Sequence, residues 1–385
     1  MIRHHTTIVI GGGPAGSAAA HTLASHGIDT AIIDKARFPR DKLCGGLLTQ
    51  RSKKIYGQIF SESWNPVIDY AAQGVKFFHQ HRLVNAVSEG HAFWFTRRCD
   101  FDQHLLQQAV ARGARLYEGD PVVELDLVAR RLRLRSGAQF SFDTLIGADG
   151  VNSLVAKTLF GKAYDADSIA FALELEVARD AYPRPLTEPE IIFGRAQWGY
   201  GWVFPKQDTL TVGLGGLLAK NPDLKNSFNE FLISRFGEIP PGKIRGHHLP
   251  FGNYRKVPGR AQVLLCGDAA GLVEPITGEG IAFAMQSGLF AAEAVIEARS
   301  NTHLAIAHYK SRYQAITRDF DHANRLRYLL FSRTCEPWFL GALPHSRTLP
   351  RKHLELMADK LQYGEYARYL AFQAMKTLAR RALFI

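Results

Sequence analysis

The strongest constraint on the fold is the segment that follows the first apolar run of the chain. Residues 7–10, Thr-Ile-Val-Ile, predict a short buried strand. The next six residues read Gly-Gly-Gly-Pro-Ala-Gly, and the glycines at 11, 13 and 16 fit G-x-G-x-x-G spacing. The first glycine permits a tight turn, the second lets backbone approach a pyrophosphate, and the third lets a helix pack on the sheet. The segment therefore predicts a dinucleotide-binding loop.

The residues after this loop complete the same unit. Residues 15–25 predict a helix with a proline at its start, and residues 30–34 predict a second buried strand. Asp34 ends that strand 18 residues after Gly16, which is close to the spacing of a ribose-binding acid. The predicted dinucleotide-binding residues of this unit are Gly11, Gly13, Pro14, Ala15, Gly16, Asp34 and Lys35.

A second glycine-rich segment lies far along the chain. The apolar run 263–266 ends in Gly267-Asp268, which places a carboxylate and bare backbone amides at a strand end. Glu274 and Glu279 flank the turn that follows, and we expect them to cap it or to face solvent. Residues 281–298 are apolar but include a glutamine and a glutamate, so we expect a buried helix rather than a membrane span.

Together with the run Gly147-Ala148-Asp149-Gly150, these motifs resemble the flavoproteins of the p-hydroxybenzoate hydroxylase-type fold. The resemblance covers residues 1 to about 300 and implies FAD as the cofactor. It implies that Asp268 holds the ribityl chain and that Asp149 supports the cofactor domain. It further implies an arginine near FAD just before a capped helix, a backbone contact to the adenine half, and a helix N-terminus at the isoalloxazine: Arg98, Val122, and Gly280 with Ile281.

Two more motifs narrow this resemblance to the geranylgeranyl reductases. The loop Cys44-Gly45-Gly46 looks like that family's Cys-Gly-Gly loop, and it implies a flavin-facing and catalytic Cys44. The run 200–205 matches most of the signature P-x-x-Y-x-W-x-F-P, although Gln197 replaces the first proline. The family reduces C=C bonds of prenyl chains with a hydride from N5 of reduced FAD. The implied substrate-binding residues are Tyr200, Trp202, Phe204 and Pro205, the first three on one side of a strand.

The remaining pattern predicts interleaved domains. Alternating apolar residues in 169–177, 198–204 and 210–214 predict an antiparallel sheet. We expect an α/β (α+β) chain in which a Rossmann-like FAD-binding domain is interleaved with an antiparallel-sheet substrate domain and followed by a helical region. The expected division is 1–74, 96–165 and 256–300 for the FAD-binding domain, 75–95 and 166–255 for the substrate domain, and 301–385 for the C-terminal helical region.

Charge and composition bear on the partners. The formal net charge is +11, and residues 321–385 hold 11 Lys/Arg against 5 Asp/Glu. Residues 363–385 mix aromatic and apolar side chains with basic ones, so either a membrane-binding amphipathic helix or an ordinary solvated basic face fits them. We expect a hydrophobic prenyl or lipid-like substrate, peripheral membrane contact, no nucleic-acid partner, and a monomer or weak dimer.

Cysteine and histidine usage adds three expectations. The four cysteines are scattered, and the histidines lack partners at metal-ligand spacing, so no metal site is expected. Only Cys335 follows Cys266, which excludes a four-cysteine iron–sulfur cluster near the C-terminus. No apolar leader precedes the first strand, so we expect a cytoplasmic protein that is peripheral to the inner face of the membrane.

Two alternatives to a prenyl reductase stay open at this point. The run Gly201–Pro205 partly resembles the W-x-W-x-I-P motif of flavin halogenases, so a monooxygenase or halogenase on the same scaffold would also fit. An electron-shuttling flavoprotein is the third reading. The electron donor is expected to be transiently bound NAD(P)H or a small redox protein, since the sequence contains no second Rossmann fingerprint.

Overall fold

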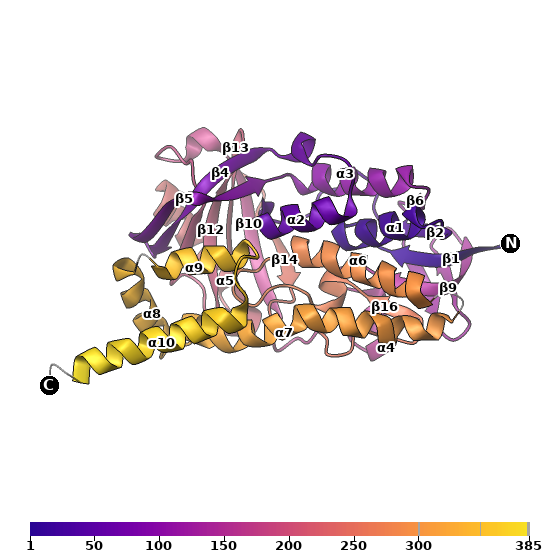
Figure 1. The fold of residues 1–385 in the computed structure, drawn as a ribbon. Helices are drawn as coiled ribbons and strands as arrows, with labels where there is room; N and C mark the ends of the chain where they lie inside the picture. The colour runs from indigo at the N-terminus through magenta and orange to yellow at the C-terminus, as the bar shows by residue number, and fades with distance from the viewer. Residues whose placement is uncertain (299–300, 347, 383–385) are drawn as a thin grey trace.

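The computed structural model describes residues 1–298, 301–346 and 348–382. Two eight-stranded sheets form the framework of the molecule. Figure 1 shows the first sheet and its helices around the N-terminus and the second sheet toward the other end, beside the C-terminal helices. The three predicted parts of the fold, a Rossmann-like unit, a second sheet and a C-terminal helical region, are confirmed.

The first sheet is centred on β1 (Ile2–Ile10), which pairs in parallel with β2 on one side and β9 on the other. Ile8 and Val9 are fully buried, as expected for a parallel sheet covered on both faces. The sheet runs in the order β15-β16-β9-β1-β2-β6, and β8 and β7 continue from β9 as an antiparallel meander. The other strands are β2 (Thr30–Asp34), β6 (Arg115–Glu118), β7 (Val122–Asp126), β8 (Arg131–Leu134), β9 (Gln139–Gly147), β15 (Gly259–Arg260) and β16 (Val263–Leu265).

Long helices cover this sheet. α1 (Pro14–Ser25) packs against α6 (Ile281–Ala298) so closely that a Cβ on Gly288 would lie 2.1 Å from the Ala15 carbonyl oxygen. Among the described residues, α6 is the one helix long and apolar enough to cross a membrane, yet 67% of it is buried inside the protein. The prediction of a buried helix over 281–298 is therefore confirmed. A buried core helix can be as long and as apolar as a helix that crosses a membrane.

The second sheet runs in the order β14-β10-β13-β12-β11-β4-β5-β3. The predicted antiparallel pairing of 169–177, 198–204 and 210–214 is confirmed by β10, β12 and β13, and among the other pairs of the sheet only β4 with β11 runs parallel. The exception arises where the two sequence-distant halves of the sheet meet. The strands are β3 (Leu47–Leu48), β4 (Tyr70–His79), β5 (Arg82–Phe95), β10 (Ala170–Ala178), β11 (Glu190–Phe193), β12 (Gly199–Pro205), β13 (Thr209–Leu217) and β14 (Arg245–Leu249).

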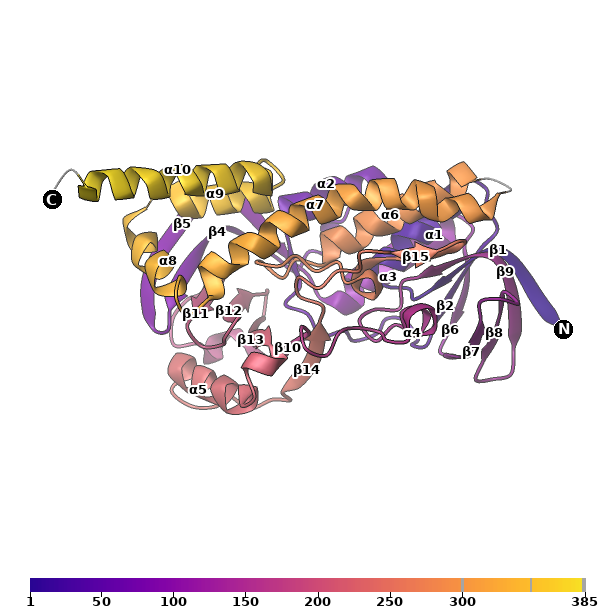
Figure 2. The same ribbon diagram turned by 90° about the horizontal axis from the view of Figure 1, so that it is seen from below.

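The remaining helices lie around the two sheets. Figure 2 shows α7 running along the molecule from the first sheet to the C-terminal helices beside the second sheet. Prolines lie in the first turns of α8 and α9, where the missing N–H breaks no intrahelical bond. Residues 383–385 of the predicted basic segment lie outside the described residues. The helices are α2 (Gln50–Ile59), α3 (Arg98–Ala111), α4 (Leu154–Phe160), α5 (Leu224–Phe236), α7 (Ala305–Phe331), α8 (Glu336–Ala342), α9 (Thr348–Met357) and α10 (Tyr363–Ala382).

Candidate functional site

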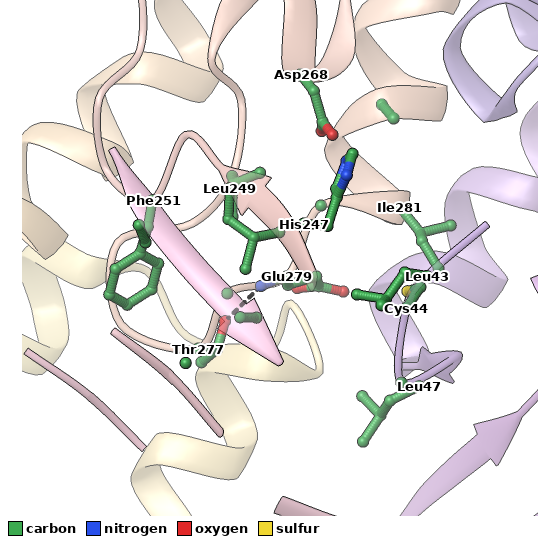
Figure 3. A pocket seen from close by; sticks show the side chains of 18 of the residues that line it. Leu43, Cys44, Leu47, His247, Leu249, Phe251, Asp268, Thr277, Glu279 and Ile281 are labelled. Atoms are coloured by element: carbon green, nitrogen blue, oxygen red, sulfur yellow. Dashed lines mark hydrogen bonds between the residues drawn. The ribbon is translucent and has the colours of Figure 1, made fainter. Parts of the chain in front are cut away.

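A cavity of about 640 Å³ collects residues from both sheets and from the C-terminal helices. Figure 3 shows side chains from several distant segments around it, among them Cys44, His247, Asp268 and Ile281. Nearly all of the predicted site residues line this cavity. They are Gly11, Gly13, Pro14, Ala15, Asp34, Lys35, Cys44, Gly45, Gly46, Arg98, Val122, Asp149, Tyr200, Trp202, Phe204, Gly267, Asp268, Gly280 and Ile281.

Two of the predicted residues do not line the cavity. A Cβ on Gly16 would lie 1.8 Å from the Gly11 carbonyl oxygen, so this glycine lets α1 pack on the loop. Pro205 ends β12 next to Phe204 and is buried, and side-chain alternation directs it to the other face of the sheet. Packing therefore accounts for both positions in the structure.

The glycine loop at the end of β1 forms one end of the cavity. Gly11 has a φ of +106°, and a Cβ there would lie 2.3 Å from the Ala148 carbonyl oxygen, so only glycine fits. Asp34 holds the loop, because its Oδ2 accepts from the Gly12 amide at 2.7 Å and its Oδ1 from the Ala36 amide at 2.8 Å. Each carboxylate oxygen keeps a second lone pair, so Asp34 can still accept from a ribose hydroxyl.

Arg40 supplies a free donor beside this loop. Its Nη2 lies 3.0 Å from Asp102 Oδ2, whereas its Nη1 is buried without a hydrogen-bond partner within the described part of the chain. The same guanidinium lies 3.3 Å from the position of a Cβ on Gly13. A buried, unpaired N–H next to a glycine loop and the N-terminus of α1 suits the oxygens of a pyrophosphate. The residues present therefore fit FAD. Sequence reasoning missed Arg40; the cluster of basic residues after β2 was the available signal.

The turn before α6 forms the neighbouring wall. Asp268 follows β16, and its carboxylate makes no hydrogen bond to any described residue. A Cβ on Gly280 would lie 3.7 Å from Asp268 Oδ1, and α6 begins at the next residue, Ile281. An unpaired carboxylate and a helix N-terminus on one wall suit hydroxyl groups and a developing negative charge, respectively. Asp149 differs, since it accepts from Ser153 Oγ and the Leu154 amide and so holds the start of α4.

The Cys44-Gly45-Gly46 loop is held between the two sheets. Gly46 has a φ of +73°, and a Cβ there would lie 2.0 Å from the Thr96 carbonyl oxygen. A Cβ on Gly45 would lie 2.7 Å from the Phe204 ring, so the loop packs directly on the aromatic strand. The Gly46 amide donates to Cys44 Sγ at 3.4 Å. The loop thus carries a thiol to the junction between the dinucleotide end and the aromatic end.

Arg98 lies beside this thiol. Its guanidinium binds Asp102 twice, at 2.7 and 2.8 Å, and also contacts Cys44. Burial opposes its charge, but Asp102 and then Cys44 hold the pKa of Arg98 above its usual value. Arg98 is the first residue of α3 and does not precede the helix, because the bond to Asp102 four residues on requires helical geometry. The expectation that this arginine stands just before the helix is therefore wrong.

The other end of the cavity is apolar and largely aromatic. Tyr200, Trp202 and Phe204 project into it from β12, and the Trp202 and Phe204 rings stack with centroids 6.2 Å apart. Tyr200 has a second task, because its hydroxyl donates to the Thr277 carbonyl in the turn before α6. Sequence reasoning missed the other apolar lining residues, several of them from the C-terminal helices: Phe77, Phe93, Ile191, Phe193, Leu249, Phe251, Leu330, Phe331, Phe339, Leu343, Leu349, Leu354 and Met357.

Three titratable residues that we did not predict also line the cavity. Burial raises the pKa of Glu174 to about 7 and lowers that of Lys42, the latter despite the nearby Asp268. Burial and then Lys42 lower the pKa of His247 to about 4. Figure 3 shows the ring of His247 among the lining side chains. Among the described residues, no group of three or more His, Cys, Asp or Glu is placed to hold a metal ion.

The two glutamates of the turn before α6 are both buried, so the expected solvent-facing alternative is wrong. Glu274 caps the turn, accepting from the Ile276 amide at 2.9 Å and from the Thr277 hydroxyl at 2.6 Å. Glu279 pairs with Arg51 of α2 at 2.8 Å, and Figure 3 shows its amide bonded to Thr277. The turn is therefore fixed by buried polar contacts to other elements.

Comparison with known proteins agrees with this geometry. Residues 4–193 match the model of the FAD binding domain family. The geranylgeranyl diphosphate reductase of Synechocystis is 30% identical over 76% of this chain and 75% of its own length. The menaquinone reductase of Mycolicibacterium smegmatis is 29% identical over 84% of both chains.

Solved structures share the fold. The crystal structure of a geranylgeranyl bacteriochlorophyll reductase-like protein from Thermoplasma acidophilum matches with a TM-score of 0.79, at 21% identity, over 96% of this chain and 99% of that one. The flavin-dependent brominase Bmp2 matches with a TM-score of 0.71, at 20% identity, over 98% of this chain and 100% of its own. With the cofactor cradle, the Cys-Gly-Gly loop and these relatives together, the chain belongs to the geranylgeranyl reductase family of FAD-dependent oxidoreductases.

Proposed function

We propose that this protein reduces C=C bonds of a prenyl or other lipid-like substrate. The observation that carries the proposal is the continuity of the cavity: it runs from the glycine loop and Asp268 past Cys44 to an end walled by aromatic and apolar side chains. A long apolar chain that enters from this end would place one double bond beside the Cys44 loop. When bound and reduced, FAD supplies the hydride equivalent for such a reduction.

The protein's own residues provide orientation and exclusion of water. The rings of Trp202 and Phe204 form a flat wall against which a prenyl chain can pack, and residues of α7 to α9 close the opposite side. Tyr200 ties this wall to the turn before α6 through Thr277. Cys44 stands where the two ends meet, so its thiol either donates a proton or tunes the cofactor environment.

The test is a single-turnover experiment without oxygen. The FAD-loaded protein is reduced with dithionite and mixed with geranylgeranyl diphosphate or menaquinone, the substrates that name two of its relatives. Reoxidation of the flavin with a product that carries two more hydrogens in its prenyl chain supports the proposal. A product that gains oxygen or halogen when air and halide are admitted supports instead the monooxygenase or halogenase alternative. The brominase, which shares the fold, is the reason to test that alternative. Mass spectrometry of lipids, quinones and pigments from cells with and without the protein would then identify the natural substrate.

We further propose transient NAD(P)H or a small redox protein as the electron donor. The rate of flavin reduction by NADH and by NADPH, compared with that by a reduced ferredoxin, separates the two.

Peripheral membrane contact is a related proposal. It is supported by the excess of basic residues in 321–385 and by Tyr328 and Leu329 of α7, which are 55% and 44% exposed. Co-sedimentation with anionic but not neutral liposomes at low salt is the expected result. Absence of binding to anionic liposomes at low salt would contradict this contact.

A further inference from the structure

A row of three residues across the second sheet brings a carboxyl group into the wall of the cavity. Trp202 of β12 and Glu174 of β10 both pair with Gly213 of β13, one from each side. A Cβ on Gly213 would lie 2.2 Å from the Trp202 indole, so the ring lies over the glycine and extends toward Glu174. The indole Nε1 is buried and has no hydrogen-bond partner within the described residues, and it lies near enough to the Glu174 carboxyl to favour the charged form of that group.

The pattern along β10 shows why this carboxyl group faces the cavity. Ala170, Ala172 and Glu174 alternate along the strand and all three line the cavity, as side-chain alternation requires. The two alanines leave space, so Glu174 is the first side chain on this face that can take part in chemistry. The whole residue is only 6% exposed.

The same row places Glu174 close to the predicted reaction centre. Trp202 Nε1 lies 3.4 Å from the position of a Cβ on Gly45, in the loop that carries Cys44. The carboxyl, the indole and the Cys-Gly-Gly loop are therefore contiguous. A carboxyl group in this place lies beside the part of the cavity where a substrate double bond would sit.

The charges around Glu174 come from several elements. Lys206 follows β12, Glu176 lies two residues further along β10, and Lys42 lies in the loop before Cys44. On β14, Arg245 pairs in register with Glu174 but forms an ion pair with Asp41, and His247 lines the cavity. Burial raises the pKa of Glu174 to about 7, against the opposing effect of Lys206. Neutral and charged forms of this carboxyl are therefore both accessible near neutral pH.

A polar cluster lies near Glu174 around the next residue on the same face of β10, Glu176. Lys206 Nζ lies 3.3 Å from both carboxylate oxygens of Glu176, and Thr211 donates to that carboxylate at 2.7 Å. The Glu176 side chain is 30% exposed, whereas that of Lys206 is only 7% exposed. Lys206 and the partly exposed Glu176 therefore act on Glu174 through their charges.

We propose that Glu174 is the acid that donates a proton to the substrate carbon during double-bond reduction. The inference rests on the proposed function. In this step the O–H bond of Glu174 breaks, and the π electron pair of the C=C bond forms a new C–H bond with that proton. Reduced FAD, the two-electron reductant of the family, would supply the hydride equivalent to the other alkene carbon. Glu174 is left as a carboxylate and regains its proton from the solvent side.

The test compares the wild-type protein with Glu174→Gln, which has nearly the same shape but carries no transferable acid proton. The matched control is Glu176→Gln, on the same face of the same strand but outside the cavity. Infrared spectra of the FAD-loaded proteins between pH 5 and 9 follow the carbonyl band of a protonated carboxyl. Single-turnover reduction of geranylgeranyl diphosphate and of menaquinone is measured over the same range of pH.

The expected result has two parts. A carboxyl band titrates near pH 7 in wild type, is absent from Glu174→Gln and persists in Glu176→Gln with a lower midpoint, because a neighbouring negative charge has been removed. Wild-type turnover falls above about pH 7, and Glu174→Gln loses roughly 100-fold or more in turnover while retaining FAD.

Three outcomes would overturn parts of this scheme, and they are distinguishable. The absence of a titrating carboxyl band in wild type overturns the role of Glu174 whatever the substrate is. Normal turnover and an unchanged pH profile in Glu174→Gln overturn that role while the proposed function stands. Failure of wild-type protein to reduce either substrate overturns the proposed function, and the proton-donor role with it.

Discussion

Arg51 Nη1 lies 2.8 Å from Glu279 Oε2, and these two side chains are only 8% and 4% exposed. Glu279 belongs to the turn before α6, whereas Arg51 lies in the first turn of α2. The same guanidinium donates through Nη2 to the Leu356 carbonyl of α9 at 2.8 Å. One buried charge therefore connects a wall of the cofactor site to α2 and to the C-terminal helices.

Replacing this arginine should destabilise the protein strongly. Arg51→Met leaves the Glu279 carboxylate buried without its partner, and we expect a loss of about 3–5 kcal/mol in the free energy of unfolding. Urea denaturation of the FAD-loaded protein measures it. The matched control is Lys54→Met on the same helix, because Lys54 pairs with Asp359 at 2.6 Å but is 60% exposed. The control should cost about 1 kcal/mol or less. Equal losses in the two variants would contradict a special role for the buried pair.

Two glycines of positive φ should respond differently to alanine. Gly27 has a φ of +72° and open space where a Cβ would lie, so Gly27→Ala should cost only about 1–2 kcal/mol. Gly11→Ala adds a contact of 2.3 Å with the Ala148 carbonyl oxygen and should displace the cofactor loop. We expect Gly27→Ala to retain FAD and Gly11→Ala to lose it. The ratio of flavin to protein absorbance after purification measures both, and an FAD-replete Gly11→Ala protein would contradict the expectation.

Acid should destabilise the fold in part through His21. Burial lowers the pKa of this histidine from 6.5 to about 4, and its Nε2 has no hydrogen-bond partner among the described residues. The unfolded chain therefore binds a proton that the folded chain excludes, so stability is full above pH 6.5 and declines as the pH falls toward 4.

His21→Leu should remove that contribution. Free energies of unfolding at pH 7 and at pH 4.5 give the comparison, and the difference between them should be smaller in the variant than in wild type. The pKa of His247 is also lowered, so the free energy of unfolding of the variant should still fall between pH 7 and pH 4.5, but by less than that of wild type. An identical decline in both proteins would show that His21 is not excluded from protonation in the fold.

Asp34 should contribute to FAD affinity through the loop it holds. Asp34→Ala leaves the buried Gly12 amide without its acceptor, at a cost of about 1–3 kcal/mol. We expect FAD to bind roughly 10- to 100-fold more weakly, as measured by titration of the apoprotein. Asp126→Ala is the matched control, because Asp126 also accepts from two backbone amides, at 2.9 and 2.8 Å, but in an exposed turn. An equal effect on FAD binding in the control would contradict the assignment.

The parts of the fold that were predictable from sequence depend on local pattern. β2 has the predicted bounds because an apolar run ends at an acid, and α6 has the predicted bounds because its apolar run begins after a glycine. The cofactor loops were predictable for the same reason, because the glycine that forms the turn lies within a few residues of the end of its strand. No knowledge of distant contacts was needed for Gly11 or Gly267.

The missing parts depend on contacts between distant segments. Glu279 is buried because Arg51, from another helix, neutralises it, and nothing near Glu279 in the sequence indicates that partner. The parallel pairing of β4 with β11 joins segments more than 100 residues apart. Glu174 was easier to detect, because it and Glu176 follow two alanines on one face of a strand whose other residues are apolar. Its role as an acid could be inferred only from the structure, because that role depends on the pairing of β10 with β13.

Cys44 and Glu174 make separable predictions for the same reaction. Cys44→Ala should retain FAD, because backbone shape at Gly45 and Gly46 keeps the loop in place, but it should lose roughly 100-fold in alkene reduction through the altered contact beside the double bond. The remaining turnover should keep the decline above about pH 7 that Glu174 imposes. Cys99→Ala, at a cysteine outside the cavity, is the control and should behave like wild type. If Cys44→Ala turned over at the wild-type rate, Cys44 would have no catalytic role; if it lost the pH dependence as well, the thiol and not the carboxyl would be the proton donor.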